Sequence, residues 1–267
     1  MTNRKLNVLV VGATGSIGSL VIEEAIRQGR AVRALVRSAS KARQLSRKAE
    51  TVIGDLARPE TLSAAVTGVD AIVFTHGSDG AGKAASESVD YGGVRNILAA
   101  LGSRKVRIAL MTSIGVTNRD SSYNRSTEAH DWKRRSERLV RASGMPYTIV
   151  RPGWFDYNAA DENKLVLLQG DKRHSGTPKD GAIARRQLAE VLVRSLSSDA
   201  AVRKTFELVS TKGASQDDFD ELFGRLEPDP PGAVNGVQDR ANMPLEQEPK
   251  RVRDDLNAVQ TQSSDAA

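Results

Sequence analysis

Three glycines at three-residue spacing, Gly12, Gly15 and Gly18, carry the clearest chemical signal in the sequence. They follow an apolar run, Val8 to Val11, that predicts a strand buried on both faces. A strand, a glycine-rich turn and a helix form a dinucleotide-binding unit, because glycine lets the backbone approach a pyrophosphate and the helix N-terminus attracts its charge. The residues expected to contact the cofactor here are Gly12, Thr14, Gly15, Ser16, Ile17 and Gly18.

Arg37 indicates which dinucleotide is bound. It stands at the end of a second predicted strand, 19 residues after Gly18, with no acidic residue up to Lys41. Enzymes that use NAD usually carry Asp or Glu here to bind the ribose hydroxyls. A guanidinium instead binds a 2′-phosphate in a fork. We therefore expect NADP (NADPH) as the cofactor, the alternative being that Arg37 is a solvated loop charge. The role of Arg33 stays open.

The composition excludes several classes of function. The 267 residues include no cysteine, which excludes disulfides and thiol catalysis, and the three scattered histidines form no metal-ligand motif. The net charge is +6, but the basic residues are dispersed and only 4% of residues are aromatic, so we expect small anionic ligands and no nucleic acid. No apolar run reaches about 18 residues, which predicts a cytoplasmic protein without signal peptide or membrane span.

The glycine turn and Arg37 require a sheet that places them side by side. Apolar runs predict strands at 8–11, 31–36, 50–53, 69–75, 106–112 and 147–150. Helices are expected between them, including 41–48, 59–66, 89–101 and a long basic helix at 127–142. This alternation predicts an α/β, Rossmann-type doubly wound parallel sheet of order 3-2-1-4-5-6, with the ligand at the carboxyl ends of the strands.

The C-terminal third is less regular. Residues 1–227 are expected to form one NAD(P)-binding domain, with a substrate-side region over about 152–227 that holds strands at 165–168 and 205–209 and helices at 185–196 and 216–226. Residues 228–267 hold five of the nine prolines and four basic against seven acidic residues. We expect an extended arm that packs on the basic body or on a second subunit, with Thr261 to Ala267 disordered.

Five segments together resemble one family, the atypical short-chain dehydrogenases/reductases of the NmrA-like, NAD(P)H-binding group. They are Gly12–Gly18, Val32–Arg37, Gly54–Leu56, Thr112–Ser113 and Ser143–Gly153. The resemblance spans roughly residues 6 to 210 and implies the Rossmann-type fold and a nicotinamide cofactor. The family is functionally diverse.

The resemblance also implies further cofactor contacts. Asp55 and Leu56 would flank the adenine, although Asp55 could instead cap the helix near Pro59. The diphosphate and ribose would pass the end of the fourth strand, where His76 could equally be a structural residue. The residues at these two places are Thr75, His76 and Gly77, and then Pro152, Gly153 and Trp154 on the nicotinamide side.

The family's catalytic motif is incomplete. Its classical members use a Ser followed by Tyr-x-x-x-Lys, in which Tyr is the general acid. Ser113 and Lys133 match, and Lys133 would bind the nicotinamide ribose, but Ala129 replaces the Tyr. Three accounts remain: Tyr123 reaches in from its loop, His130 replaces the Tyr, or no acid is present. A further alternative is that the helix is simply a solvated basic face.

Three aromatic residues follow the sixth strand and are expected to wall a planar or apolar substrate pocket: Trp154, Phe155 and Tyr157. The resulting hypothesis is an NADPH-dependent oxidoreductase that reduces a small carbonyl or quinone-type acceptor. The missing Tyr supports an alternative, a non-catalytic NADP(H)-binding redox sensor of the NmrA-like type that acts on a regulatory protein partner. A homodimer is compatible with either.

Overall fold

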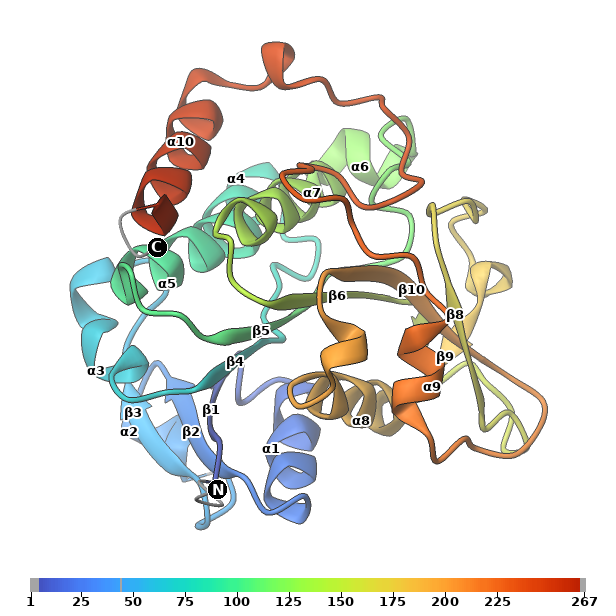
Figure 1. Ribbon diagram of the computed structural model, residues 1–267, viewed down its shortest axis with the longest axis horizontal. Helices are drawn as coiled ribbons and strands as arrows, with labels where there is room; N and C mark the ends of the chain where they lie inside the picture. The colour runs from blue at the N-terminus through green and yellow to red at the C-terminus, as the bar shows by residue number, and fades with distance from the viewer. Residues whose placement is uncertain (1–4, 44, 265–267) are drawn as a thin grey trace.

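The computed structural model describes residues 5–43 and 45–264, and an eight-stranded sheet forms its centre (Figure 1). The strand order is β3-β2-β1-β4-β5-β6-β10-β8, and only β8 runs antiparallel to its neighbour. The predicted order 3-2-1-4-5-6 is therefore confirmed and is extended by two strands. The strands are β1 Asn7–Val11, β2 Ala31–Val36, β3 Glu50–Ile53, β4 Ala71–Phe74, β5 Arg107–Met111, β6 Tyr147–Pro152, β8 Lys164–Leu168 and β10 Lys204–Thr211.

Helices cover both faces of the sheet (Figure 1). Helices α1 (Gly18–Arg27) and α8 (Arg185–Ser195) cover one face, and α5 (Gly92–Leu101) and α7 (Ala129–Ala142) cover the other. Alternate residues of β1 enter the two cores, because neighbouring side chains of a strand point to opposite faces. The sheet is thus buried on both faces, which explains the uninterrupted apolar run of β1.

Shorter elements connect these layers. They are α2 Ala39–Ala42, η1 Pro59–Thr61, α3 Ser63–Val66, α4 Lys83–Ala85, the π-helix η2 Ser86–Tyr91, α6 Ser122–Thr127, η3 Pro178–Asp180, η4 Asp199–Ala201, α9 Phe219–Gly224 and η5 Leu245–Gln247. Strands β7 (Trp154–Phe155) and β9 (Ala182–Ile183) pair in a small parallel sheet. No helix of the described residues is long and apolar enough to cross a membrane, and no three potential metal ligands of the described part converge.

Two predicted helices are wrong in extent. The helix expected at 41–48 is the single turn α2, which begins earlier because the Ser38 hydroxyl accepts a hydrogen bond from the Lys41 amide. The long helix expected at 127–142 is α7, which starts two residues later, at Ala129, because Glu128 adopts a left-handed conformation with φ +54° and separates it from the short helix α6. The expected helix at 89–101 is α5, preceded by the π-helix η2.

The C-terminal segments pack on the body of the protein. Strands β8 and β10 join the main sheet, so residues 152–227 extend the same sheet. The arm runs irregularly from 228 to 249, but its second half is the helix α10 (Lys250–Ser264), which packs on α7 and α5 (Figure 1). The expectation of an extended arm is therefore wrong for this half. Disorder was expected from Thr261, but α10 continues to Ser264; residues 265–267 lie outside the described residues.

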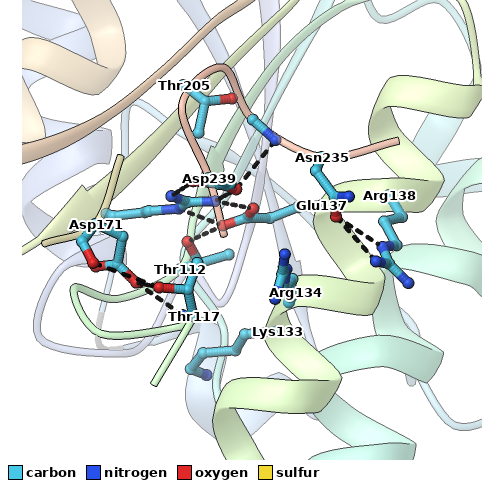
Figure 2. A network of polar contacts seen from close by, with 12 residues as sticks. Thr112, Thr117, Lys133, Arg134, Glu137, Arg138, Asp171, Thr205, Asn235 and Asp239 are labelled. Atoms are coloured by element: carbon cyan, nitrogen blue, oxygen red, sulfur yellow. Dashed lines mark hydrogen bonds and ion pairs between the residues drawn. The ribbon is translucent and has the colours of Figure 1, made fainter. Parts of the chain in front are cut away.

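The basic helix α7 is not a solvated face. Its arginines are buried beneath the arm, where Arg135 and Arg138 bind Glu248 at 2.6 and 2.7 Å. Figure 2 shows Asn235 bound to Arg138. Close to this pair, the carboxylates of Glu137 and Asp239 both bind the guanidinium of Arg151. We call these residues the α7–arm charge network. It comprises Arg134, Arg135, Glu137, Arg138, Arg141 and Arg151 with Asp229, Asn235, Asp239, Asn242 and Glu248 of the arm.

Candidate cofactor and active site

The glycine turn has no room for side chains at two of its positions. A Cβ on Gly12, whose φ is +86°, would lie 2.6 Å from the backbone nitrogen of His76, and a Cβ on Gly18 would lie 2.1 Å from the Gly12 carbonyl oxygen. The ends of β1 and β4 and the start of α1 therefore meet in direct backbone contact. The residues between these glycines, Thr14 to Ser16, are exposed, whereas Ile17 is buried in the core.

The first turn of α1 remains available to an anion. Ile17, its N-cap residue, makes no side-chain hydrogen bond to this turn. The exposed turn and the uncapped helix N-terminus fit a dinucleotide pyrophosphate.

Arg37 and Arg33 differ in what they already bind. Arg33 is tied to Glu50, with 3.0 Å between Nε and Oε2, and to the carbonyl of Thr67, so it joins β2 to its surroundings. Arg37 is exposed just after β2 and makes no hydrogen bond or ion pair with any residue that the structure describes. Of the two, Arg37 has the guanidinium that is free to bind a ligand.

Asp55 and Leu56 both take part in local structure. The Asp55 carboxylate accepts a hydrogen bond from the Ala57 amide at 3.0 Å and so closes the turn before η1, whose N-cap is Arg58. The Leu56 carbonyl accepts a hydrogen bond from the Asn96 side chain at 2.6 Å. Asp55 is therefore not the cap of η1, and its carboxylate instead stabilises the turn at residues 55–58.

The end of β4 is held tightly. The Thr75 hydroxyl donates to the Val11 carbonyl at 3.0 Å, and His76 Nε2 donates to the Val89 carbonyl at 3.1 Å. The Nδ1 atom of His76 is buried without a partner among the described residues. Burial lowers the pKa of His76 to about 4, so its ring is neutral near pH 7. His76 is therefore anchored through Nε2, while its Nδ1 stays buried without a partner among the described residues.

Lys133 has a partner that the sequence did not indicate. Its Nζ lies 2.5 Å from Oδ1 of Asp90, a buried residue of the π-helix η2. Asp90 also accepts hydrogen bonds from the Ser78 amide and hydroxyl, at 3.1 and 2.5 Å. A Cβ on Gly77 would lie 3.6 Å from Nζ, so Lys133 faces the end of β4. An aspartate within an apolar helical pattern, between Val89 and Tyr91, was the available signal for Asp90.

Tyr123 and His130 lie together, and Ser113 lies at the end of β5. The two rings are 5.2 Å apart between centroids. The Ser113 Oγ and the His130 Nδ1 are both buried, and neither has a hydrogen-bond partner in the described part of the chain. Burial lowers the pKa of His130. The pKa of Tyr123 is raised, first by burial and then by the charge of Asp90, although 45% of the residue is exposed.

The turn after β6 engages its own backbone groups. The Pro152 carbonyl accepts from the Ile114 amide at 3.0 Å, and the amides of Gly153 and Trp154 each donate at 2.9 Å, to the carbonyls of Leu208 and Gly181. These two amides and this carbonyl are therefore already used within the protein. The carboxamide of a nicotinamide bound near this turn would have to be bound by other groups.

The aromatic residues of this turn are only partly buried. Trp154 and Tyr157 are 37% and 65% exposed and form an edge-on pair with ring centroids 6.0 Å apart. Phe155 is half-buried beneath the guanidinium of Arg185, 5.1 Å from its ring centroid. An exposed aromatic pair beside a parallel-sheet carboxyl edge suits a planar or apolar ligand.

Comparison with known proteins agrees with this geometry. Residues 12–199 match the model of the NAD(P)H-binding family. Sanguinarine reductase from Eschscholzia californica is 28% identical over 84% of this chain and 97% of that protein. The photosystem II assembly factor Ycf39 from Synechocystis is 27% identical over 83% of this chain and 68% of that protein.

A solved structure shares the fold. It is described as a putative NAD-dependent epimerase/dehydratase from Bacillus halodurans and superposes with a TM-score of 0.67 at 23% identity, covering 83% of this chain and 100% of that one. At this identity the similarity supports the fold and says nothing of the reaction.

Proposed function

The chain belongs to the NAD(P)H-binding family, and on that premise we propose that it is an NADPH-dependent reductase of small conjugated carbonyl compounds of the quinone type. The glycine turn and α1 would hold the diphosphate, and Arg37 the 2′-phosphate. The bound cofactor would supply a hydride. The name of the related sanguinarine reductase supports a reductase activity.

The observation that carries this proposal is the pair of unpartnered buried atoms, Ser113 Oγ and His130 Nδ1. Native proteins seldom bury polar atoms without partners, because each such atom costs about 1–3 kcal/mol. A hydroxyl and an imidazole nitrogen left unpaired at the carboxyl end of the sheet suit an oxygen-bearing ligand. Lys133, held by Asp90, would bind the nicotinamide ribose beside them.

The acceptor class follows from the acid groups. His130 is uncharged near neutral pH because its pKa is lowered, and Tyr123 keeps its proton because its pKa is raised. A neutral imidazole and a phenol of raised pKa are weaker proton donors than an imidazolium or a Tyr whose pKa is lowered by a Lys. A quinone accepts hydride without much acid assistance, because conjugation stabilises the charge on its oxygen, which then takes a proton from water. Trp154 and Tyr157 would stack on the acceptor.

The second candidate is a non-catalytic NADP(H) sensor that acts on a protein partner. Ala129 stands where the family keeps its Tyr, and Lys133 is already neutralised by Asp90. Ycf39, whose name describes an assembly factor, is a relative of comparable similarity.

A turnover assay separates the two. Protein and NADPH are mixed with a panel of quinones and aldehydes, and the absorbance of the reduced cofactor is followed. We expect oxidation with quinones and little with aldehydes. Tight NADPH binding without oxidation across the panel would favour the sensor. Among variants, Lys133→Ala should weaken NADPH binding, whereas His130→Ala should alter turnover alone.

Cofactor preference gives a separate test of Arg37. Replacing it by Ala removes the charged donor to the 2′-phosphate, and hydrogen bonds to charged groups contribute about 1.5–3 kcal/mol. We expect NADPH affinity to fall by about 10- to 100-fold while NADH affinity is unchanged, measured by titration of cofactor fluorescence. A wild-type protein that binds NADH tenfold more tightly than NADPH would contradict the assignment.

A further inference from the structure

Arg185 lies where the cofactor-binding turn meets the aromatic turn after β6. It is the first residue of α8, and its Nε donates to the Ser16 hydroxyl at 3.3 Å. The same guanidinium is ion-paired with Asp156 and covers the ring of Phe155. The Arg185 side chain is 35% exposed, so a ligand in the glycine turn can reach it.

The packing of α8 on α1 places the Arg185 side chain beside the glycine turn. Arg186 pairs with Glu23 at 3.4 Å, and Glu190 with Arg27 at 3.7 Å, so α8 and α1 run side by side in the same direction. Helix α1 begins at the glycine turn, and α8 begins further along α1, where its first side chain, that of Arg185, reaches back to Ser16. Arg185 adds a full positive charge to this edge.

Asp156 keeps Arg185 in place in the absence of an anion. Its backbone is left-handed, with φ +60°, a conformation that aspartate and asparagine adopt more readily than most residues with a side chain. In this conformation its Oδ1 accepts the Arg185 backbone amide at 3.0 Å, and its Oδ2 binds the guanidinium. One carboxylate therefore both caps α8 and holds the arginine over the turn.

We propose that Arg185 binds the diphosphate of the dinucleotide. Its guanidinium would leave the ion pair with Asp156 and form one with the diphosphate instead. This assignment rests on the proposed function, since it requires a nicotinamide dinucleotide in the glycine turn. A diphosphate carries more charge than one carboxylate and can accept both parallel donors of a guanidinium. Because NAD and NADP share the diphosphate, Arg185 serves both cofactors, unlike Arg37.

The test is a binding titration with NADPH and with NADH. We expect Arg185→Gln to weaken both cofactors equally, by about tenfold or more, since a charged donor is lost. Arg186→Gln is the matched control, because this neighbouring arginine is largely exposed and pairs with Glu23, away from the turn; its affinities should stay within about twofold. The melting temperature of each variant checks that it is folded.

Asp156→Asn tests the exchange itself. Asparagine tolerates the left-handed backbone and still accepts the Arg185 amide, but it releases the guanidinium. We expect both cofactors to bind about two- to fivefold more tightly, as for the loss of a partly exposed ion pair. Unchanged affinity in Arg185→Gln, or a loss for NADPH alone, would overturn the inference. A wild-type protein that binds neither cofactor would overturn the proposed function and this inference with it.

Discussion

Lys133 and Arg134 are consecutive residues of α7, yet they belong to regions with opposite properties. Lys133 faces Asp90 and the end of β4, in the candidate site. Arg134 lies in the α7–arm charge network, where it donates to the Asn242 side chain at 2.6 Å and the Arg240 carbonyl. In Figure 2, no dashed line joins Lys133 to the other residues drawn.

The two regions differ in how their charged groups are paired, although one buried atom of the network, Nε of Arg134, also lacks a partner among the described residues. In the network, the guanidinium of Arg151 is fully buried between Glu137 and Asp239, with a distance of 2.7 Å to each. Burial by itself would raise the pKa of Glu137. The charge and hydrogen bonds of Arg151 oppose this effect, and the pKa of Glu137 is lowered to about 2. In the site, Ser113 Oγ and His130 Nδ1 lack partners. Charges that are paired within the protein stabilise the fold, whereas a buried hydroxyl or imidazole nitrogen without a partner can form a hydrogen bond with a ligand.

The largest effect is expected when the network is broken. Arg151→Met leaves Asp239 buried without its cation and Glu137 with only Arg141, at 3.3 Å, which costs about 3–5 kcal/mol of unfolding free energy. Urea unfolding measures the loss. Asp239→Asn is the milder variant, since the amide oxygen still accepts a hydrogen bond. A loss below about 1 kcal/mol in Arg151→Met would show that the network does not stabilise the fold.

The site should respond in the opposite way. Ser113→Ala removes a buried hydroxyl that has no partner, so the unfolding free energy should stay equal or rise by up to about 1 kcal/mol. Quinone turnover should fall by about 10- to 100-fold if this hydroxyl binds the acceptor oxygen. Loss of stability together with full turnover would reverse our assignment of this residue.

Glu207, which contacts Arg151 of the network, should give the protein a pH-dependent stability. Burial raises the pKa of Glu207 to about 8, and its Oε1 lies 3.4 Å from Arg151. The unfolded chain releases this proton near pH 4.3, so the folded state holds an extra proton from there to about pH 8. Unfolding free energy should therefore fall as pH rises through this range, by at most about 1.4 kcal/mol per pH unit.

Glu207→Gln isolates this contribution, because the glutamine side chain does not ionise. Denaturant unfolding at several pH values between about 5 and 8 should show a flatter slope in the variant. The pKa of Glu137 lies far below this range and does not interfere. An identical slope in both proteins would show that Glu207 is ionised throughout.

The smallest effect concerns the contact of the arm with η2. The Tyr91 hydroxyl donates to the carboxylate of Asp255 in α10 at 2.8 Å. Tyr91 directly follows Asp90, the partner of Lys133. Tyr91→Phe should cost about 1 kcal/mol of stability and speed hydrogen exchange in α10. NADPH affinity should not change. A marked loss of affinity would show that the arm and the cofactor site are coupled through η2.

Local patterns were sufficient wherever a residue's neighbours in sequence decide its environment. The apolar runs and the helices expected between them predicted the strand order up to β6, and the glycine spacing predicted a turn in which Cβ atoms have no room. The same reasoning failed for α7, because a helix whose arginines are buried and a helix whose arginines are solvated can have the same composition. The partners that bury these arginines lie about a hundred residues later, in the arm.

The sequence by itself determined the sheet, the glycine turn and the position of Arg37 at the end of β2, because each depends on local spacing and backbone sterics. Only the tertiary structure decided that Asp90 holds Lys133, that Arg185 reaches Ser16, and that the arm satisfies the arginines of α7. The physical reason is that a charge is buried only when distant segments supply its partner.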